Sequence, residues 1–235
     1  GRIKNVILLG GAVRGRYRVG ALAAMVDGGT FEMCAAKTYV SGIAMVGGLV
    51  GAVAYGSITQ CHTSGVVAGT ERFVGGVVGR YGEGISASIL LECYSRTSVV
   101  GGYEYVGGLV GLNVGFIQNS FVAGEVTAGA GSAHVGGFAG ENSGVISTSY
   151  WDIDVTGQSS SAGGTGRSTA EMTCPYAENT YVGWNFTDTW IEDVEPASNA
   201  GYPRLQGNPP LPEENCDDGD LCTIDTYQWE TCECM

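Results

Sequence analysis

One short motif returns along this chain at nearly constant spacing, and that regularity restricts the fold more than any other feature. The motif reads VGALAA from Val19, VGGLVG from Val46, VGGVVG from Val74, VGGLVG from Val106 and VGGFAG from Val135. Successive copies are 27, 28, 32 and 29 residues apart, and a degenerate copy, AGGTGR, begins at Ala162. Repeats of this length predict a solenoid in which each repeat forms one coil and no repeat folds alone.

A second element keeps the same period: an apolar residue, two variable residues, a small residue and often an aromatic one. It appears as ITQCH from Ile58, IQNSF from Ile117 and ISTSY from Ile146. The unit is rich in Val and Ile, and 40 of the 235 residues are Gly. Glycine at this density disfavours helices, since each costs about 1 kcal/mol in a helix interior. We therefore predict an all-β fold, a parallel β-solenoid of about five to six coils of 27–32 residues, with the Gly pairs at corners or bulges.

The repeat unit, including the loop LNVGF at Leu112 and GEVTAG from Gly124, resembles the GLUG motif of bacterial cell-surface and secreted proteins. The stretch from Ser149, with GWNFTDTW from Gly183 and GYPRL from Gly201, is similar to the segment that closes such arrays in adhesin-like proteins. The resemblance implies a β-helix-like solenoid, an extracellular or cell-surface location and no single activity, because such arrays also form stalks on secreted proteases. The chain then divides into GLUG-type repeats at 1–148, a solenoid-capping region at 149–206, a Pro-rich linker at 207–215 and a Cys-rich acidic module at 216–235.

Charge is distributed unevenly along the chain. The formal net charge is −13, but residues 1–145 carry +1 and residues 146–235 carry −14. An acidic chain of this kind argues against a nucleic-acid partner, which requires a basic surface. Gly or a charge interrupts every apolar stretch before about 18 residues, so we expect no membrane span. The bases cluster near the N-terminus, at Arg2, Lys4, Arg14, Arg16 and Arg18.

The eight cysteines fall into two groups. Cys34, Cys61 and Cys93 occupy the same position of consecutive repeats and are expected to stack as a ladder of buried thiols, because their parallel Cβ vectors disfavour a disulfide. The C-terminal run CDDGDLCTIDTYQWETCEC is dense enough to predict a disulfide-stapled module from an oxidising compartment. It resembles a short Cys-rich extracellular repeat first described in slime-mould proteins, with Tyr227 where another Cys is expected. The disulfide candidates are Cys174, Cys216, Cys222, Cys232 and Cys234.

Two further features have two interpretations each, and a third is a possible modification site. Asp217, Asp218, Asp220 and Asp225 form either a calcium site or a solvated acidic turn, and no other cofactor is expected. Trp151, Trp184 and Trp190 either cover the apolar edge of the last coil or form a sugar-binding platform. Asn185 begins a glycosylation sequon, which matters only in a host that glycosylates such sites.

No catalytic constellation stands out in the sequence. The carboxylates of the repeats are scattered singly, and the chain contains no GxSxG, HExxH or P-loop motif. His62 and His134 lie at different phases of the repeat, which argues against a shared histidine site. We therefore expect a protein without enzymatic activity.

The charge distribution suggests how copies of the chain could meet. A basic N-terminal coil (Arg2, Lys4, Arg14, Arg16 and Arg18) and an acidic tail (Glu213, Glu214, Asp217, Asp218 and Asp220) predict a head-to-tail contact that does not close, and such a contact builds a filament. The sequence therefore predicts an extracellular structural protein, a subunit of a surface fibre whose main partner is another copy of itself. The alternative is an adhesin module or stalk of a larger secreted protein, with surface glycans or a neighbouring cell surface as partners.

Overall fold

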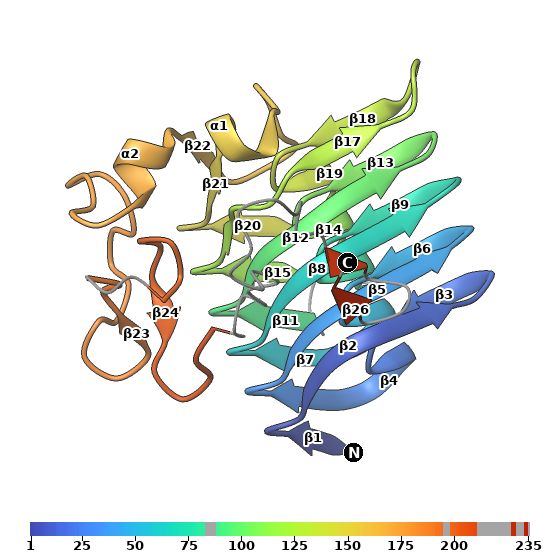
Figure 1. The fold of residues 1–235 in the computed structure, drawn as a ribbon, viewed down its shortest axis with the longest axis horizontal. Coiled ribbons are helices and arrows are strands. Elements are labelled where there is room, and N and C mark those ends of the chain that lie inside the picture. Colours follow the sequence, from blue (N-terminus) through green and yellow to red (C-terminus); the bar gives the residue numbers. More distant parts are fainter. Residues whose placement is uncertain (83–87, 195–197, 211–226, 229–232, 235) are drawn as a thin grey trace.

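The computed structural model describes residues 1–82, 88–194 and 198–210, together with the backbone of 227–228 and 233–234. The chain winds into about five coils, and the stacked coils form three parallel sheets (Figure 1). The predicted all-β parallel solenoid is confirmed. In the described residues the helices are two single turns, α1 (Ile153–Thr156) and α2 (Thr169–Met172).

Each coil contributes one strand or strand pair to each sheet. The nine-stranded sheet, called sheet A here, contains β1 (Arg2–Lys4), β4 (Ala23–Glu32), β7 (Val50–Thr59), β10 (Val78–Tyr81), β11 (Ser88–Leu91), β14 (Val110–Asn113), β15 (Phe116–Gln118), β19 (Ala139–Asn142) and β20 (Val145–Ser147). The eight-stranded sheet, sheet B, contains β2 (Ile7–Arg14), β5 (Ala35–Gly42), β8 (His62–Gly69), β12 (Tyr94–Gly101), β16 (Phe121–Val122), β17 (Val126–Ala128), β21 (Tyr150–Asp152) and β22 (Thr165–Arg167). The five-stranded sheet, sheet C, contains β3 (Tyr17–Gly20), β6 (Ala44–Gly47), β9 (Arg72–Gly75), β13 (Glu104–Gly107) and β18 (Ala133–Gly136).

The repeated motifs become vertical ladders of equivalent side chains. Parallel register pairs Val46 with Val74 and then Val74 with Val106, all three fully buried. A second ladder joins Phe31, Ile58, Leu90 and Ile117 inside the solenoid. Burying one such aliphatic side chain stabilises the fold by about 1.5–3 kcal/mol, and each coil buries its side chains against the next.

The Gly pairs lie at the corners between sheets C and A, where adjacent coils approach closely. A Cβ at Gly48 would lie 2.1 Å from the carbonyl oxygen of Gly76 in the next coil. A Cβ at Gly47 would lie 2.2 Å from the carbonyl oxygen of Val50. No larger residue fits these two positions, so the corner explains the Gly pair.

Sheet B continues beyond residue 148, because β21 pairs with β16 and β22 pairs with β21. Residues 168–194 and 198–206, called the flanking lobe here, then leave the solenoid and pack against one of its sides (Figure 1). The lobe contains a short antiparallel pair, β23 (Trp190–Ile191) with β24 (Arg204–Leu205). A second antiparallel pair joins β25 (Tyr227–Gln228) to β26 (Glu233–Cys234).

The two ends of the solenoid differ. At the C-terminal end, residues 157–167 cover part of the last coil, with the Ser160 carbonyl accepting from Gly137 N–H at 3.1 Å and the Ser161 Oγ accepting from Ala139 N–H at 2.9 Å. Strands β18 and β20 of that coil have a strand neighbour on one side alone among the described residues. At the N-terminal end, β1 pairs with the second half of β4 only, through Thr30, Phe31 and Glu32. In the described part of the chain, the first half of β4 has a strand neighbour on one side alone.

No helix among the described residues is long and apolar enough to cross a membrane.

Candidate functional site

The open N-terminal edge is the first candidate site. Ile3 begins the interior ladder that continues with Phe31 and Ile58, yet 39% of its surface is exposed because no coil lies below it. Met25, on the unpaired half of β4, is 42% exposed. A hollow of about 340 Å³ lies along this edge, bounded by Ile3, Met25, Asp27 and Phe31. An edge with apolar side chains and unpaired backbone groups is a template for another strand.

The predicted basic cluster is divided between opposite ends of β2. Arg2 and Lys4 lie on β1, and both form ion pairs with Glu32 of the same molecule. Hydrogen bonds from Lys4 and Arg2 lower the pKa of the Glu32 carboxyl. Surface pairs of this kind are worth little, about 0–1 kcal/mol, and they already satisfy these two cations.

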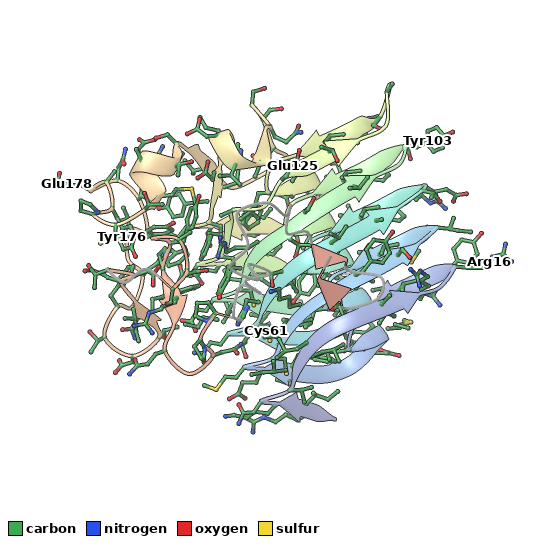
Figure 2. The ribbon with its side chains drawn as sticks, viewed as in Figure 1. Arg16, Cys61, Tyr103, Glu125, Tyr176 and Glu178 are labelled. Carbon is green, nitrogen blue, oxygen red and sulfur yellow. The ribbon has the colours of Figure 1, made fainter. Side chains whose placement is uncertain are left out.

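The other three cations lie at or beyond the far end of β2. The Arg14 guanidinium carbon is 5.5 Å from the centre of the Tyr39 ring, and that of Arg16 is 5.8 Å from the Tyr17 ring. Figure 2 shows Arg16 at the tip of the corner between β2 and β3. Arg18 occupies the left-handed region at the next corner, with φ of 55°, and is exposed. The acidic partners expected in the tail, Glu213, Glu214, Asp217, Asp218 and Asp220, lie outside the described residues.

The three repeat cysteines stack inside the corner between sheets A and B. The backbone N–H of Cys34 donates to Cys61 Sγ at 3.3 Å, and that of Cys61 donates to Cys93 Sγ at 3.4 Å. All three thiols are buried and free. A hydrogen bond with Cys61 and burial raise the pKa of the Cys34 thiol, and burial raises that of Cys61. The thiols of Cys34 and Cys61 therefore stay protonated, and all three cysteines act as structural hydrogen-bonding groups.

The ladder continues past the cysteines through two serines. Cys93 N–H donates to Ser120 Oγ at 3.1 Å, and Ser120 N–H donates to Ser149 Oγ at 3.2 Å. Each side chain also donates to the carbonyl two residues earlier, as Cys61 Sγ does to Thr59 at 3.2 Å and Ser149 Oγ to Ser147 at 2.8 Å. This position thus requires a small side chain that both donates and accepts a hydrogen bond. The small residue of the second repeat element is the sequence feature that marks this position.

Directly after this ladder comes a row of rings that point out of the solenoid. The His62 imidazole stacks on Tyr94 with centroids 4.6 Å apart and planes 1° apart, and Tyr94 stacks on Phe121 at 4.9 Å. Tyr150 occupies the next coil. The sequence showed an aromatic residue here in several repeats, but its outward orientation was not inferred.

The flanking lobe covers this row with its own aromatic side chains. Trp184 and Trp190 are 7% and 0% exposed, and they pack on Phe121 with centroids 6.3 and 6.0 Å away. Trp151 points into the solenoid interior, where it joins the core at the last coil. The ring faces of all three tryptophans are therefore packed within the protein, and Trp184 and Trp190 cover the flank of the coils rather than the end.

Two buried carboxylates hold the lobe in place. Asp193 accepts hydrogen bonds from the backbone N–H groups of Ser198, Asn199 and Gly201 at 3.0, 2.7 and 2.9 Å. Burial opposes ionisation of Asp193, but these hydrogen bonds outweigh it and lower the pKa below its ordinary value. Asp152 caps α1 and accepts from Tyr202 Oη at 2.6 Å, which ties the lobe to β21 of sheet B.

A strap follows the lobe and crosses two coils. This strap, residues 207–210, forms the start of the predicted Pro-rich linker. Asn208 is 2% exposed, and its Nδ2 donates to the carbonyl oxygens of Cys34 and Gln60 at 3.2 and 2.9 Å. The Pro209 carbonyl oxygen lies 3.1 Å from His62 Nε2. Burial lowers the pKa of His62 to about 4, so the ring is neutral at pH 7.

The remaining predicted sites are separate from one another. Cys174 is half-buried, and burial raises its pKa. Asn185 is exposed on the lobe, and its Oδ1 accepts from the N–H groups of Thr187 and Asp188 at 2.9 and 3.0 Å. His134 is exposed on the solenoid, with Nδ1 2.8 Å from Glu141 Oε2. The calcium candidates Asp217, Asp218, Asp220 and Asp225, and the cysteines Cys216, Cys222 and Cys232, lie outside the described residues, as does the Cys234 side chain. The described residues contain no cluster of three or more His, Cys, Asp or Glu that could hold a metal.

Comparison with known proteins supports the fold. A crystal structure from Bacteroides ovatus, named as a "putative immunoglobulin A1 protease", superposes with a TM-score of 0.64 over 87% of this chain and 76% of that one. The two chains share a fold. Their sequences are 18% identical, so the likeness does not extend to activity. No protein-family model matches the chain, and no curated protein matches it in sequence.

Proposed function

We propose that this chain is a non-enzymatic extracellular structural protein, a rigid GLUG-type β-solenoid unit that joins its neighbour by coil-on-coil stacking in a surface fibre. One observation carries the proposal: both ends of the solenoid present strand edges, the first half of β4 at the N-terminal end and β18 and β20 at the C-terminal end, each with a strand neighbour on one side alone in the described residues. Stacking the last coil of another copy on β4 adds main-chain hydrogen bonds and buries Ile3 and Met25.

Charge supports a contact between unlike ends. Arg16 and Arg18 lie at exposed corners of the first coil, whereas residues 146–235 carry −14. Attraction between a basic end and an acidic end of identical subunits gives a head-to-tail arrangement, which propagates rather than closing. The extracellular location rests on the resemblance to surface arrays and on the Cys-rich C-terminal sequence.

The same edge supports a second candidate, a stalk in a longer secreted protein. Each later coil pairs with the coil before it in parallel register, as Ala23 does with Val50. A coil preceding Gly1 in a longer chain would occupy the edge of β4 in that register. In this case the stacking partner belongs to the same polypeptide, and copies of the chain do not polymerise.

Sedimentation velocity over a range of concentrations tests the fibre, with Ile3→Lys as the blocking variant. A lysine at the open end of the interior ladder opposes stacking, because desolvating an ammonium is costly. Ile89→Lys is the matched control, since Ile89 is 44% exposed on β11, in the middle of the solenoid. We expect wild type and Ile89→Lys to form large species and Ile3→Lys to remain monomeric.

Two other outcomes contradict the fibre. If the wild type is monomeric at every concentration, the fibre is excluded and the stalk in a longer secreted protein is the remaining candidate. If the wild type stops at a dimer that Ile3→Lys abolishes, the open edges pair with each other in a closed contact, and no filament can form.

A further inference from the structure

One face of the solenoid, the outer side of sheet B over the first coils, is basic and partly apolar. Strands β2, β5, β8 and β12, all within the described part of the chain, contain no Asp or Glu. Their outward positions include Arg14, Lys37 and Arg96. The flanking lobe covers the start of β12 at Tyr94 and reaches Arg96, whose Nη1 donates to Asn199 Oδ1 at 3.3 Å. The outward side chains of β2 and β5, with Arg14 and Lys37, lie outside the aromatic cluster of the lobe.

Exposed apolar side chains accompany the cations on this face. Ile7 and Leu9 on β2 are 51% and 54% exposed, and Val100 on β12 is 44% exposed. Lys37, paired in register with Leu9, behaves differently: it is only 8% exposed.

The strap brings the chain to this face. Asn208 bonds to the carbonyls of Cys34 and Gln60, immediately before β5 and β8, and Pro209 contacts His62 at the start of β8. The 25 residues from 211 to 235 therefore begin beside the basic face. They contain eight acids, no base and several large apolar residues, among them Leu221, Ile224 and Trp229. An eight-residue strand spans about 27 Å, which is well within the reach of 25 residues.

We propose that the acidic tail, residues 211–235, docks on the outer face of β2, β5 and β8 of its own molecule, with its carboxylates at Lys37 and Arg14 and its apolar side chains over Leu9. The face and the tail match in charge sign and in apolar content, and the strap fixes where the tail starts. A tail held in this way uses its acids within one molecule, so they do not link one copy to the next. The inference rests on the fold and not on the proposed fibre, but it bears on that fibre: the end-to-end contact would then depend on paired strand edges and on the acids of residues 146–210.

Zero-length carbodiimide crosslinking of the full chain tests this directly, because it joins an amine only to a carboxylate in contact with it. The chain has two lysines, Lys4 and Lys37. Lys4 is paired with Glu32, so a Lys4–Glu32 crosslink is the internal positive control. Mixing equal amounts of ¹⁴N- and ¹⁵N-labelled protein before crosslinking distinguishes a contact within one molecule from a contact between two.

We expect a crosslink between Lys37 and an acid of residues 211–235, found by mass spectrometry in peptide pairs of a single isotope. Absence of that crosslink while Lys4–Glu32 forms would overturn the proposal. Mixed-isotope Lys37–tail pairs would also overturn it, since they place the tail on a neighbouring copy.

A second measurement uses Lys37 variants and does not depend on the crosslink. Replacing Lys37 by Glu is expected to raise hydrogen–deuterium exchange of the tail amides by on the order of tenfold, because a like charge repels the acidic tail. Lys37→Arg keeps the cation and is expected to leave that exchange unchanged. Equal exchange in both variants and in the wild type would contradict docking.

Discussion

At the scale of single residues, the corners of this solenoid place ordinary side chains in the left-handed region. Residues Met33, Gln60, Glu92, Asn119 and Thr148 precede the small-residue ladder in successive coils, with φ of 50°, 51°, 55°, 50° and 41°. For a β-branched residue this conformation is strained. Thr148 is the β-branched member of this series.

We predict that Thr148→Asn stabilises the protein. Asn tolerates positive φ and would stack on Asn119, which occupies the same corner in the preceding coil. The expected gain in the free energy of unfolding is about 0.5–1 kcal/mol, measured by urea denaturation. Thr165→Asn, at an exposed strand position with ordinary φ, is the control and is expected to be neutral or slightly destabilising. A loss of stability in Thr148→Asn would contradict the account of corner strain.

His62 couples stability to pH. Its pKa falls from 6.5 to about 4 on folding because burial disfavours the imidazolium. Burial of His62 therefore adds a penalty to folding that is absent above pH 6.5 and grows to about 3 kcal/mol as the pH falls from 6.5 to 4. We predict that His62→Phe, which can still stack on Tyr94, flattens the pH dependence of the unfolding free energy in this range.

The unfolding free energy of His62→Phe is compared with that of the wild type across this pH range. An unchanged slope in His62→Phe would show that His62 does not couple folding to pH.

At the scale of the elements, the small-residue ladder links every coil by hydrogen bonds. Cys61 Sγ accepts from Cys34 N–H and donates to the Thr59 carbonyl, and Ser120 and Ser149 play the same part in later coils. We predict that Cys61→Ser changes stability by less than about 1 kcal/mol, whereas Cys61→Val costs about 1–3 kcal/mol because the Cys34 N–H loses its partner. Thermal unfolding of the two variants measures the difference, and equal values would contradict the role of the ladder.

The flanking lobe depends on Asp193. Its carboxylate stabilises the folded state above its unfolded pKa of about 3.8, and that contribution disappears as the pH falls through the lower folded value. We predict that Asp193→Asn destabilises the lobe by about 1–3 kcal/mol, since charge-assisted hydrogen bonds to three backbone N–H groups weaken. Tryptophan fluorescence reports this change, because Trp184 and Trp190 lie in the lobe interior. Unaltered fluorescence and stability at pH 7 would contradict it.

The sequence predicts the structure of the repeated elements but not that of the segments that depart from the repeat. The Val19-to-Val135 period predicts coil number, corner glycines and the stacking of Cys34, Cys61 and Cys93, since identical coils in register place equivalent residues together. The position of the lobe was not predictable in the same way, because Trp184 and Trp190 lie outside the repeat and their target is a row of outward rings. The contacts of Asn208 could not be predicted from the sequence, since its hydrogen-bond partners are backbone carbonyls, which every coil presents.

At the scale of the whole molecule, the solenoid has one covered flank and strand edges at both ends. The lobe covers the flank at Tyr94 and Phe121, whereas the first half of β4 at one end and β18 and β20 at the other have a strand neighbour on one side alone in the part of the chain that the structure describes. An unpaired β edge of this kind ordinarily leads to strand pairing unless it is protected. The strand edges at the two ends are therefore the basis for proposing assembly.

Electron microscopy of the native protein in a salt series tests this claim most directly. Five coils at about 4.8 Å each give a rod of about 24 Å before the covering segments are added, so a fibre should repeat every few tens of Å along its axis. We predict fibres with that repeat, which shorten as ionic strength rises because screening weakens the contact between basic and acidic ends. Separate single rods at every salt concentration would contradict assembly through the open edge.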